Sequence, residues 1–581
     1  MASPALPEFR SHLADLLRQA LHAIELGDAA QVPELQRPKH ARLGDYSSSV
    51  AMQLAKALQR NPRELAQQLA AAVPSSPLVE HVEVAGGGFV NFFLKLSAKQ
   101  SVVPRILDAG SAYGRGRHGQ GTRIQVEYVS ANPTGPLHVG HGRGAAYGAS
   151  VASILEAAGY DVCREYYVND AGRQMDILAL STWLRYLELA GVDVAFPPNA
   201  YRGDYVRTMA REMFDAHADR YARDVHTIYD GVPPVETQPE EHLDALVANA
   251  KRILGADYGY VHELALTEQL GDIRNDLLEF GVEYDSWFSE RSLYTAGAVE
   301  RALALLEKNG YLYVQDGARW FQSSRFGDEK DRVVQRENGA FTYFAADIAY
   351  HLNKFERGFT RVVNIWGADH HGYVPRVKGA LAACGIDAER LRVALVQFAI
   401  LYREGKKISM STRAGEFVTL RELRHEVGKD AARFFYVMRK SDQHLDFDLD
   451  LAKSQSQENP VYYVQYAHAR VCSVLAQWGG DAAALPGVDV SPLGTEHELA
   501  LLARLMDYPA LVEAAAADLA PHALANYLRD LAGEFHSYYN ATQFLVPEDA
   551  LRLARLALVT AVRQVIHNGL SLLGVSAPQK M

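Results

Sequence analysis

The stretch SANPTGPLHVGHGRGAAYG, Ser130–Gly148, decides the fold. It opens with the turn Asn-Pro-Thr-Gly-Pro over 132–136, which cannot continue a strand because proline lacks the backbone N–H that a sheet needs. The residues before it, RIQVEYV at 123–129, have the composition of a buried strand. Apolar residues at helical spacing follow until the stop at Gly159. The stretch therefore predicts a strand–turn–helix unit.

The same alternation continues along the chain. A second strand is expected in YDVCREYYV, 160–168, and a second helix over 169–189. Two further strands are expected in RVVNIWGADHHG, 361–372, and RVALVQFAILYR, 392–403. Strands that alternate with helices are typical of a parallel sheet with crossover helices, which is an α/β fold of the Rossmann type.

The regions on either side of the sheet differ in character. Near the start, one helical segment and a glycine-rich turn into an aromatic strand indicate a small α+β unit. The last part of the chain has helical periodicity throughout. We predict an N-terminal accessory domain at 1–120, a catalytic domain at 121–453 with a helical insertion at about 190–270, and an all-α domain at 454–581.

Composition limits the classes of function. Hydrophobic residues make up 48% and charged residues 22% of the 581, as in an ordinary globular protein. The net charge of −11 means that local basic patches would have to hold a nucleic acid. The three cysteines are far apart, which argues against a disulfide framework or a structural zinc site. No apolar run is long enough to cross a bilayer and the first residues are charged, so a cytoplasmic protein without a membrane partner is expected.

The two histidines of the turn, His138 and His141, require an explanation. They lie where the first strand of a parallel sheet passes into its helix, and ligands bind at the carboxyl ends of such strands. The helix N-terminus there attracts phosphate, and imidazole N–H groups can add hydrogen bonds. The small Gly140 leaves room for a flat base to approach the backbone. Phosphate binding, metal binding and simple helix capping are three alternatives that this motif alone does not separate.

A wider set of motifs resembles one known family. PLHVGH, 136–141, resembles the HIGH motif of class I aminoacyl-tRNA synthetases, and the longer string from Glu127 to Gly148 resembles the arginyl-tRNA synthetases in particular. DALRLA, 549–554, is similar to the motif of the DALR anticodon-binding domain, and 42–66 to the family's extra N-terminal domain. Further blocks follow in the expected order: YYVNDAG, FGDEKDRVV, TYFAADIAYH, WGADHHGYVPRVKGAL, MSTRAGEFVTLREL and NPVYYVQYAHARV.

The resemblance implies an ATP-dependent ligase that activates L-arginine and transfers it to tRNA(Arg), with ATP and Mg²⁺ as cofactors and with a monomer as the expected state. Positioning and charge stabilisation would supply most of the catalysis. By resemblance, His138 and His141 hold the phosphates, Gly140 lies near adenine, and Asp369 and His370 lie at a strand end by the ribose. The alternative for Asp369 and His370 is a metal site or an ordinary turn.

A guanidinium group requires planar acceptors, ideally carboxylates. Glu127 ends the first strand. Asp347 stands four residues after Tyr343, so Tyr343 and Asp347 would share one face of a helix. By resemblance, Glu127, Tyr343 and Asp347 bind arginine, and Asn132 meets its α-amino or carboxylate end. The alternative for Asp347 is a solvated helix face.

The second class I motif, KMSKS, is degenerate in this chain. SMSTR, 409–413, keeps Met410 and Ser411 but neither lysine, and the lysine that some arginyl enzymes carry just before HIGH is absent. Lys406 and Lys407 are the nearest spare cations, and we expect one of them to replace the missing charge at the phosphates, with Lys407 favoured because it is nearer to Met410. An ordinary solvated basic turn is the alternative.

The expected tRNA contacts lie at the two ends of the chain. Aromatic and basic side chains can stack on bases and pair with phosphates, although aromatics at helical spacing are more often core. The rival interpretations are a non-catalytic tRNA-binding homologue, which the broken KMSKS motif favours, another HIGH-type nucleotidyltransferase, and, more distantly, a metallohydrolase. The tRNA-binding candidates are Asn91, Tyr462, Tyr466, Arg470, Arg552, Arg555 and Arg563.

Overall fold

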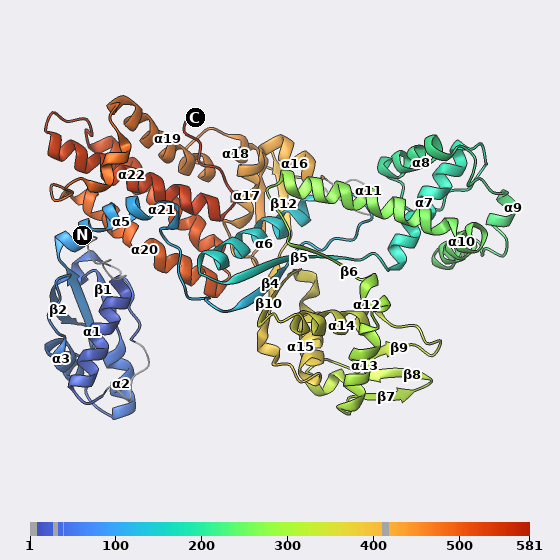
Figure 1. Ribbon diagram of the computed structural model, residues 1–581, viewed down its shortest axis with the longest axis horizontal. Coiled ribbons are helices and arrows are strands. Elements are labelled where there is room, and N and C mark those ends of the chain that lie inside the picture. The colour runs from blue at the N-terminus through green and yellow to red at the C-terminus, as the bar shows by residue number, and fades with distance from the viewer. Residues whose placement is uncertain (1–8, 27–32, 39, 409–417) are drawn as a thin grey trace.

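A five-stranded parallel sheet forms the centre of the molecule (Figure 1). The computed structural model describes residues 9–26, 33–38, 40–408 and 418–581. The strands lie in the order β11-β10-β4-β5-β6, and each neighbouring pair runs parallel. Their bounds are β4 (Arg123–Glu127), β5 (Asp161–Val168), β6 (Ser286–Ser289), β10 (Arg361–Gly367) and β11 (Leu391–Val396).

This order confirms the predicted α/β fold of the Rossmann type. The chain builds outward from β4 through β5 to β6, and then returns to add β10 and β11 on the other side of β4. The order therefore reverses between β4 and β10, and ligands of such sheets bind in the crevice beyond the carboxyl ends of the strands at this point. Helix α6 (Val139–Ala157) connects β4 to β5 and packs on β4, β5 and β10, and α7 (Arg173–Leu189) follows β5.

Helix α6 lies unusually close to the sheet because glycines and small residues line it. A Cβ on Gly148 would come within 2.3 Å of the ring of Tyr128, which is itself fully buried. Arg143, also buried, donates from its guanidinium to the backbone oxygens of Gln397, Lys440 and Gln443. The start of α6 is therefore fixed both to the sheet and to the segments that follow it.

The expected single strand over 392–403 is instead two strands in two sheets. β11 ends at Val396, and β12 (Ala399–Arg403) belongs to a separate small sheet with the order β13-β12-β14. The break has a physical cause, because the backbone of Gln397 bonds to Arg143 and to the carbonyl of Ser441 rather than continuing the ladder. The other elements here are β13 (Lys406–Lys407), α16 (Leu420–Val427), α17 (Lys429–Val437), β14 (Leu445–Asp448) and α18 (Leu449–Lys453).

A third sheet, of short antiparallel strands, comes between β6 and β10 along the chain and was not expected from the sequence. It joins β7 (Leu312–Gln315), β8 (Ala318–Phe321) and β9 (Arg332–Gln335). These strands and four of the helices that follow β6 share a small hydrophobic core. The helices of this part are α12 (Arg291–Thr295), α13 (Ala298–Lys308), α14 (Tyr343–Glu356) and α15 (Val374–Ala383).

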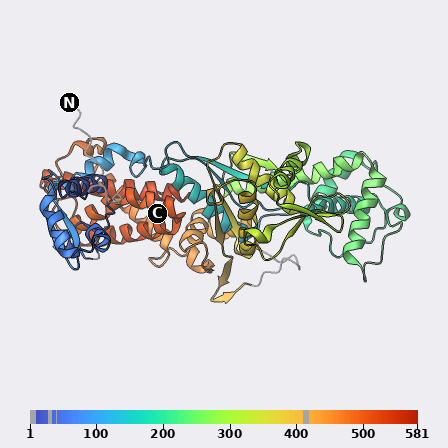
Figure 2. The same cartoon turned by 90° about the horizontal axis from the view of Figure 1, so that it is seen from below.

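A helical arm projects from one end of the molecule, opposite to the N-terminal part (Figures 1 and 2). It has its own hydrophobic core, built around the fully buried Trp183 of α7. Its helices are α8 (Asp204–His217), α9 (Val225–Ile228), α10 (Pro239–Leu254) and α11 (Asp257–Glu279).

The two ends of the chain lie side by side at the other end of the molecule. The N-terminal part packs helices on a three-stranded antiparallel sheet of order β1-β3-β2, and the last part is a bundle of long helices (Figure 1). The N-terminal elements are α1 (Phe9–Ala23), β1 (Tyr46–Ser48), α2 (Val50–Leu58), α3 (Pro62–Ala72), β2 (Val79–Ala85), β3 (Phe89–Leu94), α4 (Leu96–Gln100) and α5 (Val102–Ala109). The bundle contains α19 (Pro460–Trp478), α20 (Glu496–Asp518), α21 (Pro521–Ala541) and α22 (Asp549–Leu572).

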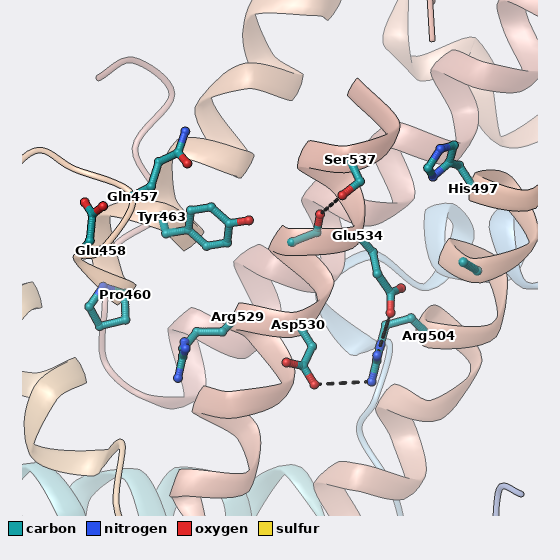
Figure 3. A pocket seen from close by; sticks show the side chains of 12 residues that line it. Gln457, Glu458, Pro460, Tyr463, His497, Arg504, Arg529, Asp530, Glu534 and Ser537 are labelled. Carbon is teal, nitrogen blue, oxygen red and sulfur yellow. Dashed lines mark hydrogen bonds and ion pairs between the residues drawn. The ribbon is translucent and has the colours of Figure 1, made fainter. Parts of the chain in front are cut away.

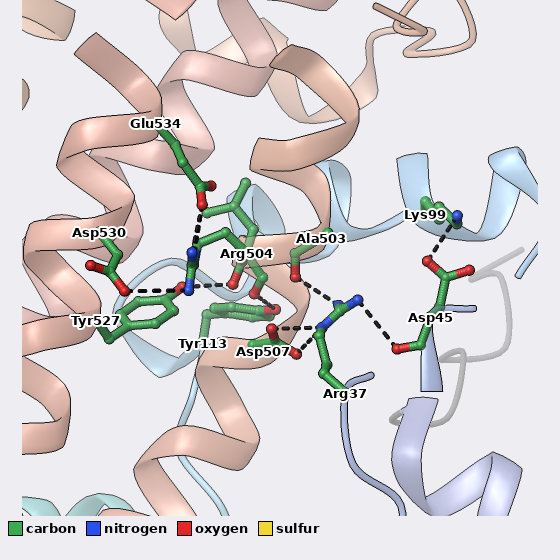
Figure 4. Close-up of polar contacts among 11 residues, drawn as sticks. Arg37, Asp45, Lys99, Tyr113, Ala503, Arg504, Asp507, Tyr527, Asp530 and Glu534 are labelled. Carbon is green, nitrogen blue, oxygen red and sulfur yellow. Dashed lines mark hydrogen bonds and ion pairs between the residues drawn. The ribbon is translucent and has the colours of Figure 1, made fainter. Parts of the chain in front are cut away.

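Polar contacts fasten the N-terminal part to α20 of the bundle (Figure 4). Arg37 donates through Nε to both carboxylate oxygens of Asp507 at 2.6 Å, and through Nη2 to the carbonyl of Ala503 at 2.8 Å. The hydroxyl of Tyr113 donates to the carbonyl of Leu505 at 2.9 Å. A guanidinium paired with a carboxylate in two bonds fixes orientation as well as distance, so these contacts define how the two parts sit together.

Candidate active site

One cavity of about 540 Å³ lies at the point where the strand order reverses. Its walls come from the ends of β4 and β10, the start of α6, and one face of α14. This is the position that the fold favours for a ligand. The cavity gathers most of the site residues expected from the sequence: Glu127, Asn132, His138, Gly140, His141, Asp347, Asp369 and His370.

The two histidines cap helix α6 and also line the cavity. The backbone N–H of Gly140 donates to Nδ1 of His138 at 3.1 Å, and the backbone N–H of His138 donates to Nδ1 of His141 at 3.2 Å. Their rings stack with centroids 3.7 Å apart. Because each Nδ1 accepts a hydrogen bond, the proton of each neutral imidazole is on Nε2. Capping, one of the three alternatives, is therefore observed, and in both rings it places the proton on Nε2.

Both imidazoles are neutral at physiological pH. Burial lowers the pKa of His138, and burial with the neighbouring His138 lowers the pKa of His141 to about 3. A neutral donor can stabilise charge that develops on a ligand without carrying a proton on and off the site.

Gly140 has no room for a side chain. A Cβ there would lie 2.9 Å from Cε1 and Nδ1 of His138 and 3.3 Å from the ring of Phe398, which is 52% exposed beside it. The glycine therefore allows the capping imidazole to fold back over the helix start.

Carboxylates occupy the opposite part of the site. Asp347 accepts a hydrogen bond from the hydroxyl of Tyr373, and burial together with the charge of Glu127 raises the pKa of Asp347 to about 6. Glu290, which follows β6 and is 3% exposed, has a pKa raised to about 7 by burial and by the charges of Asp347 and Asp170. Buried acids that lack a full complement of internal cations favour a cationic ligand. Glu290 is, however, not among the residues that line the cavity.

Glu127 is held differently from the other two acids. Its Oε2 accepts from the ammonium of Lys354 at 2.5 Å, and its Oε1 accepts from the hydroxyl of Ser130 at 3.1 Å. The sequence analysis missed Lys354, which lies seven residues after Asp347 and so on the same face of α14. A charged residue within an otherwise apolar helical stripe could have indicated it.

Backbone strain marks the end of β4. Val129 and Ser130 have φ angles of 67° and 44°, in the left-handed region that a β-branched residue such as valine rarely adopts. Such strain persists only where the surroundings enforce it, and it clusters at functional sites. Here the hydroxyl of Ser130 also accepts from the backbone N–H of Tyr167 at 3.1 Å, which holds the strained turn in place.

Asn132 and the strand-end pair Asp369 and His370 lie more openly on the cavity wall. Asn132 donates to Gln174 Oε1 at 2.5 Å and accepts from Asn169 Nδ2 at 3.1 Å. Asp369 lies just beyond β10, as its position in the sequence predicts, with its side chain 61% exposed. These groups are accessible to a ligand.

Some of the expected site residues are not among the lining residues of the cavity. Tyr343 is the first residue of α14 and is 59% exposed, so its spacing from Asp347 does not bring both side chains into the cavity. Lys407 lies exposed on β13. Met410 and Ser411 lie outside the described residues.

The described residues on the far side of that segment touch the histidine turn. The backbone N–H of Val139 donates to the carbonyl of Val418 at 3.1 Å, and that of Leu420 donates to the carbonyl of Leu137 at 2.8 Å. Residues 418–420 therefore lie against the histidine turn. On the N-terminal side of that segment, residues 404–408 follow directly after β12.

An aromatic and basic cluster lies on α19. Tyr462 and Tyr466 stack with ring centroids 5.8 Å apart, and the guanidinium of Arg470 lies over the rings of Tyr466 and Tyr539 at 4.5 and 4.6 Å. All of these side chains are half-buried. Part of each ring therefore remains open to a partner.

Two residues expected to bind tRNA are bonded to buried side chains of the protein. Asn91 is 3% exposed, and its Oδ1 accepts from the hydroxyl of Ser47 at 2.6 Å. Arg555 pairs through Nε with the fully buried Glu498 at 3.1 Å. Because both side chains are bonded to buried partners, these contacts give the two expectations no support.

The other two arginines of the tail differ from each other. Arg552 donates to the carbonyls of Val546 and Pro547 at 2.9 and 3.1 Å, which ties down the loop before α22, and it also pairs with Asp549. Arg563 lies half-buried in the middle of the same helix.

A second cavity, of about 840 Å³, lies in the helical bundle (Figure 3). Its lining carries charges of both signs. Arg504 pairs with Glu534 at 2.6 Å and lies 3.7 Å from Asp530. The ring of Tyr463 forms part of another wall. The arginines, acids and tyrosine here offer hydrogen bonds and stacking but no reactive group.

The described part of the chain contains no group of three or more histidine, cysteine, aspartate or glutamate side chains that could hold a metal ion. Within the same residues, none of the helices combines the length and the apolar character that a bilayer crossing needs.

A parallel sheet with a histidine turn at its switch point defines the class I aminoacyl-tRNA synthetases, and comparison with known families agrees. Residues 102–194 and 272–455 match the family described as tRNA synthetases class I (R), catalytic domain. Residues 11–94 match the arginyl tRNA synthetase N terminal domain, and residues 464–581 match the DALR anticodon binding domain.

Whole-chain relatives narrow the class to one family. The chain is 65% identical to the arginine–tRNA ligase of Nitrosospira multiformis over 581 residues, which is 100% of both chains. It is also 65% identical to the arginine–tRNA ligase of Aromatoleum aromaticum, over 98% of this chain and 99% of that protein. The structure of arginyl-tRNA synthetase from Thermus thermophilus matches with a TM-score of 0.75 at 25% identity, covering 98% of this chain and 100% of that one. The chain belongs to the arginyl-tRNA synthetase family, which confirms the resemblance noted in its sequence.

Proposed function

We propose that this protein is an ATP-dependent arginine–tRNA ligase. In the first step, a carboxylate oxygen of L-arginine attacks the α-phosphorus of ATP, and pyrophosphate leaves. In the second step, a hydroxyl of the 3′-terminal ribose of tRNA(Arg) attacks the carbonyl carbon of the adenylate, and AMP leaves. Full-length identity to relatives named as arginine–tRNA ligases supports this activity, and nothing found supports a non-catalytic homologue or another nucleotidyltransferase.

The acidic part of the cavity is the proposed site for the guanidinium of arginine. Asp347 lines this part and offers acceptors for a planar cation, and it is buried enough that an unpaired negative charge there is costly. Glu127 and Asn132 lie nearer to the histidine turn in the sequence and line the same cavity, and we assign them to the α-amino and carboxylate end. Tyr343 would join this site only by turning inward from its exposed position.

The histidine turn is the proposed site for the phosphates. The Nε2–H groups of His138 and His141 would donate to phosphate oxygens, and the N-terminus of α6 adds a favourable dipole. Gly140 would lie near adenine, and Asp369 and His370 would accept and donate at the ribose. Lys407, with Met410 and Ser411 on the same loop, is the proposed source of further contacts to the pyrophosphate.

Mg²⁺ would accompany ATP rather than sit in a dedicated protein site. This ion keeps several waters and takes only one or two carboxylates besides substrate phosphates, which fits the lack of a metal-ligating cluster among the described residues. When bound, it would neutralise charge on the phosphates.

The helical bundle is the proposed region of tRNA contact. The half-buried Tyr462, Tyr466 and Arg470 could stack on bases and meet phosphates, and Arg563 is the tail arginine that remains a candidate. We retain the domain boundaries given above, a cytoplasmic location and a monomeric state as proposals.

The observation that carries the proposal is the presence, in one cavity, of two neutral histidines and of the buried carboxylate of Asp347. The test is to charge total tRNA with each amino acid separately in the presence of ATP and Mg²⁺. Arginine alone should be attached, and lysine should be rejected because an ammonium cannot reproduce a two-bond guanidinium contact. Charging with another amino acid, or none, would overturn the proposal.

A further inference from the structure

A lysine ammonium is buried directly behind the proposed arginine site. Lys354 of α14 has no solvent exposure, and its Nζ donates to Glu127 Oε2 at 2.5 Å and to Asn364 Oδ1 at 2.8 Å. Lys354 is not among the residues that line the cavity, whereas Glu127 is. The lysine can therefore affect a ligand only through its bond to Glu127.

The lysine is one of two groups that fix the Glu127 carboxylate. The second is the hydroxyl of Ser130, which donates to Oε1 at 3.1 Å from the strained turn after β4. With one partner on each oxygen, the carboxylate has a single orientation. A glutamate without the lysine would be free to rotate, and it would face the negative charge of Asp347 without a neighbouring cation.

The lysine also connects Glu127 to the backbone of Asp347. His351 Nδ1 lies 2.7 Å from the carbonyl oxygen of Asp347, and since a carbonyl only accepts, this nitrogen carries the proton. His351 Nε2 therefore accepts from Asn364 Nδ2 at 2.7 Å, which leaves Asn364 Oδ1 to accept from Lys354. The direction of each of these bonds is therefore determined.

Stability alone does not call for such a pair. A buried ion pair can often be replaced by apolar side chains of similar volume with little loss of stability, whereas removal of one partner is costly. Here the pair lies at the wall of the cavity, and its hydrogen bonds run from one proposed arginine-binding residue to another.

We propose that Lys354 is a positioning residue of the arginine site, which holds the Glu127 carboxylate in one orientation for the substrate. This inference rests on the proposed function. It assigns to Lys354 no contact with substrate and no role toward ATP. Loss of the lysine should therefore weaken the use of arginine and leave the use of ATP nearly unchanged.

The same helix offers a matched control. Arg357, one turn further along α14, pairs with the buried Glu165 of β5 at 2.6 and 2.9 Å. This is also an ion pair between α14 and a carboxylate of the central sheet, but Glu165 is not among the residues that line the cavity. If such pairs are merely structural, their removal should have similar consequences.

The experiment compares Lys354→Met with Arg357→Met in the full-length protein. The measured quantities are KM for arginine, KM for ATP and the rise in melting temperature that saturating arginine produces, the last being independent of catalysis. Lys354→Met should raise the arginine KM by roughly tenfold to a hundredfold, as expected for a displaced binding group, and should shrink the arginine-induced rise. Arg357→Met should lower the melting temperature but keep the wild-type arginine KM and arginine-induced rise.

Asn364→Ala keeps the lysine and removes one of its acceptors, so it tests the inference if Lys354→Met does not fold. It should raise the arginine KM in the same direction, by a smaller factor. An unchanged arginine KM in the folded variants, or equal changes for Lys354→Met and Arg357→Met, would overturn the inference. If wild-type protein does not use arginine at all, the proposed function fails instead, so the two failures are distinguishable.

Discussion

Replacement of Asp347 by asparagine tests the recognition of the guanidinium group directly. The substitution keeps the size of the side chain and one acceptor oxygen, and Tyr373 can still donate to it. It removes the negative charge in a site whose burial already raises the pKa of Asp347 to about 6. The guanidinium would then be buried with one of its carboxylates missing.

The size of the effect follows from the burial. Truncation of one partner of a buried, hydrogen-bonded charge pair costs about 2–5 kcal/mol, and each 1.4 kcal/mol is about tenfold. We therefore expect kcat/KM for arginine to fall by roughly thirtyfold to several thousandfold. The ATP KM should stay close to the wild-type value, because the histidine turn is unaltered.

The assay is ATP–pyrophosphate exchange driven by arginine, with tRNA present throughout. Asp45→Asn is the control, since Asp45 is a buried aspartate of the N-terminal part that pairs with Lys99 at 2.8 Å. Wild-type kinetics for arginine in Asp347→Asn, or an equal loss in Asp45→Asn, would refute the assignment.

The pH dependence of the wild-type enzyme gives a second readout of the same reasoning. The raised pKa values mean that Glu290 takes up a proton as the pH falls through about 7 and that Asp347 does so as it falls through about 6. A protonated acid cannot pair with a guanidinium, so kcat/KM for arginine should decline through this window. The ATP KM should not follow, because burial lowers the pKa of both histidines and keeps them neutral.

Three further substitutions address other parts of the molecule. Gly140→Ala should raise the ATP KM and lower kcat in the exchange assay, because its Cβ would lie 2.9 Å from the neighbouring imidazole; activity at the wild-type level would contradict the tight turn. Lys407→Ala should slow single-turnover charging by about a hundredfold to a thousandfold if it supplies the missing cation, with Lys406→Ala as the control; a wild-type rate would make Lys407 an ordinary surface residue. Arg555→Met should destabilise the fold by about 3–5 kcal/mol, since its glutamate partner is fully buried, and a raised tRNA KM at an unchanged melting temperature would instead restore the tRNA contact expected from the sequence.

The central fold and the histidine turn could be predicted because their signals are local. The prolines after β4 end a strand, and the apolar spacing of α6 and its glycines require a helix close to a sheet. The strand that splits after Val396 could not be predicted, since the cause is Arg143, which is 254 residues distant from Gln397 in the chain and captures its carbonyl.

The site was predicted best where a residue's position in a strand–turn–helix unit defines its surroundings. Glu127, His138, His141 and Asp369 all reach the cavity for this reason. Helical spacing was less reliable: Tyr343 shares a helix with Asp347 but begins it, so its side chain faces solvent.

Long-range partners explain most of the remaining differences. Nothing near Asn91 or Arg555 in the sequence reveals that they bond to Ser47 and Glu498, respectively, in the fold. The same holds for the pairing of Lys354 with Glu127, which are 227 residues apart. Such contacts form only when the tertiary structure brings distant segments together.

The most direct test of the account is a structure of the protein bound to a non-hydrolysable analogue of arginyl-adenylate. We predict that the guanidinium lies within hydrogen-bond distance, about 3 Å, of the Asp347 carboxylate, and that the phosphate accepts from Nε2 of His138 or His141. A ligand bound in the opposite direction, or outside the cavity at the carboxyl ends of β4 and β10, would contradict it.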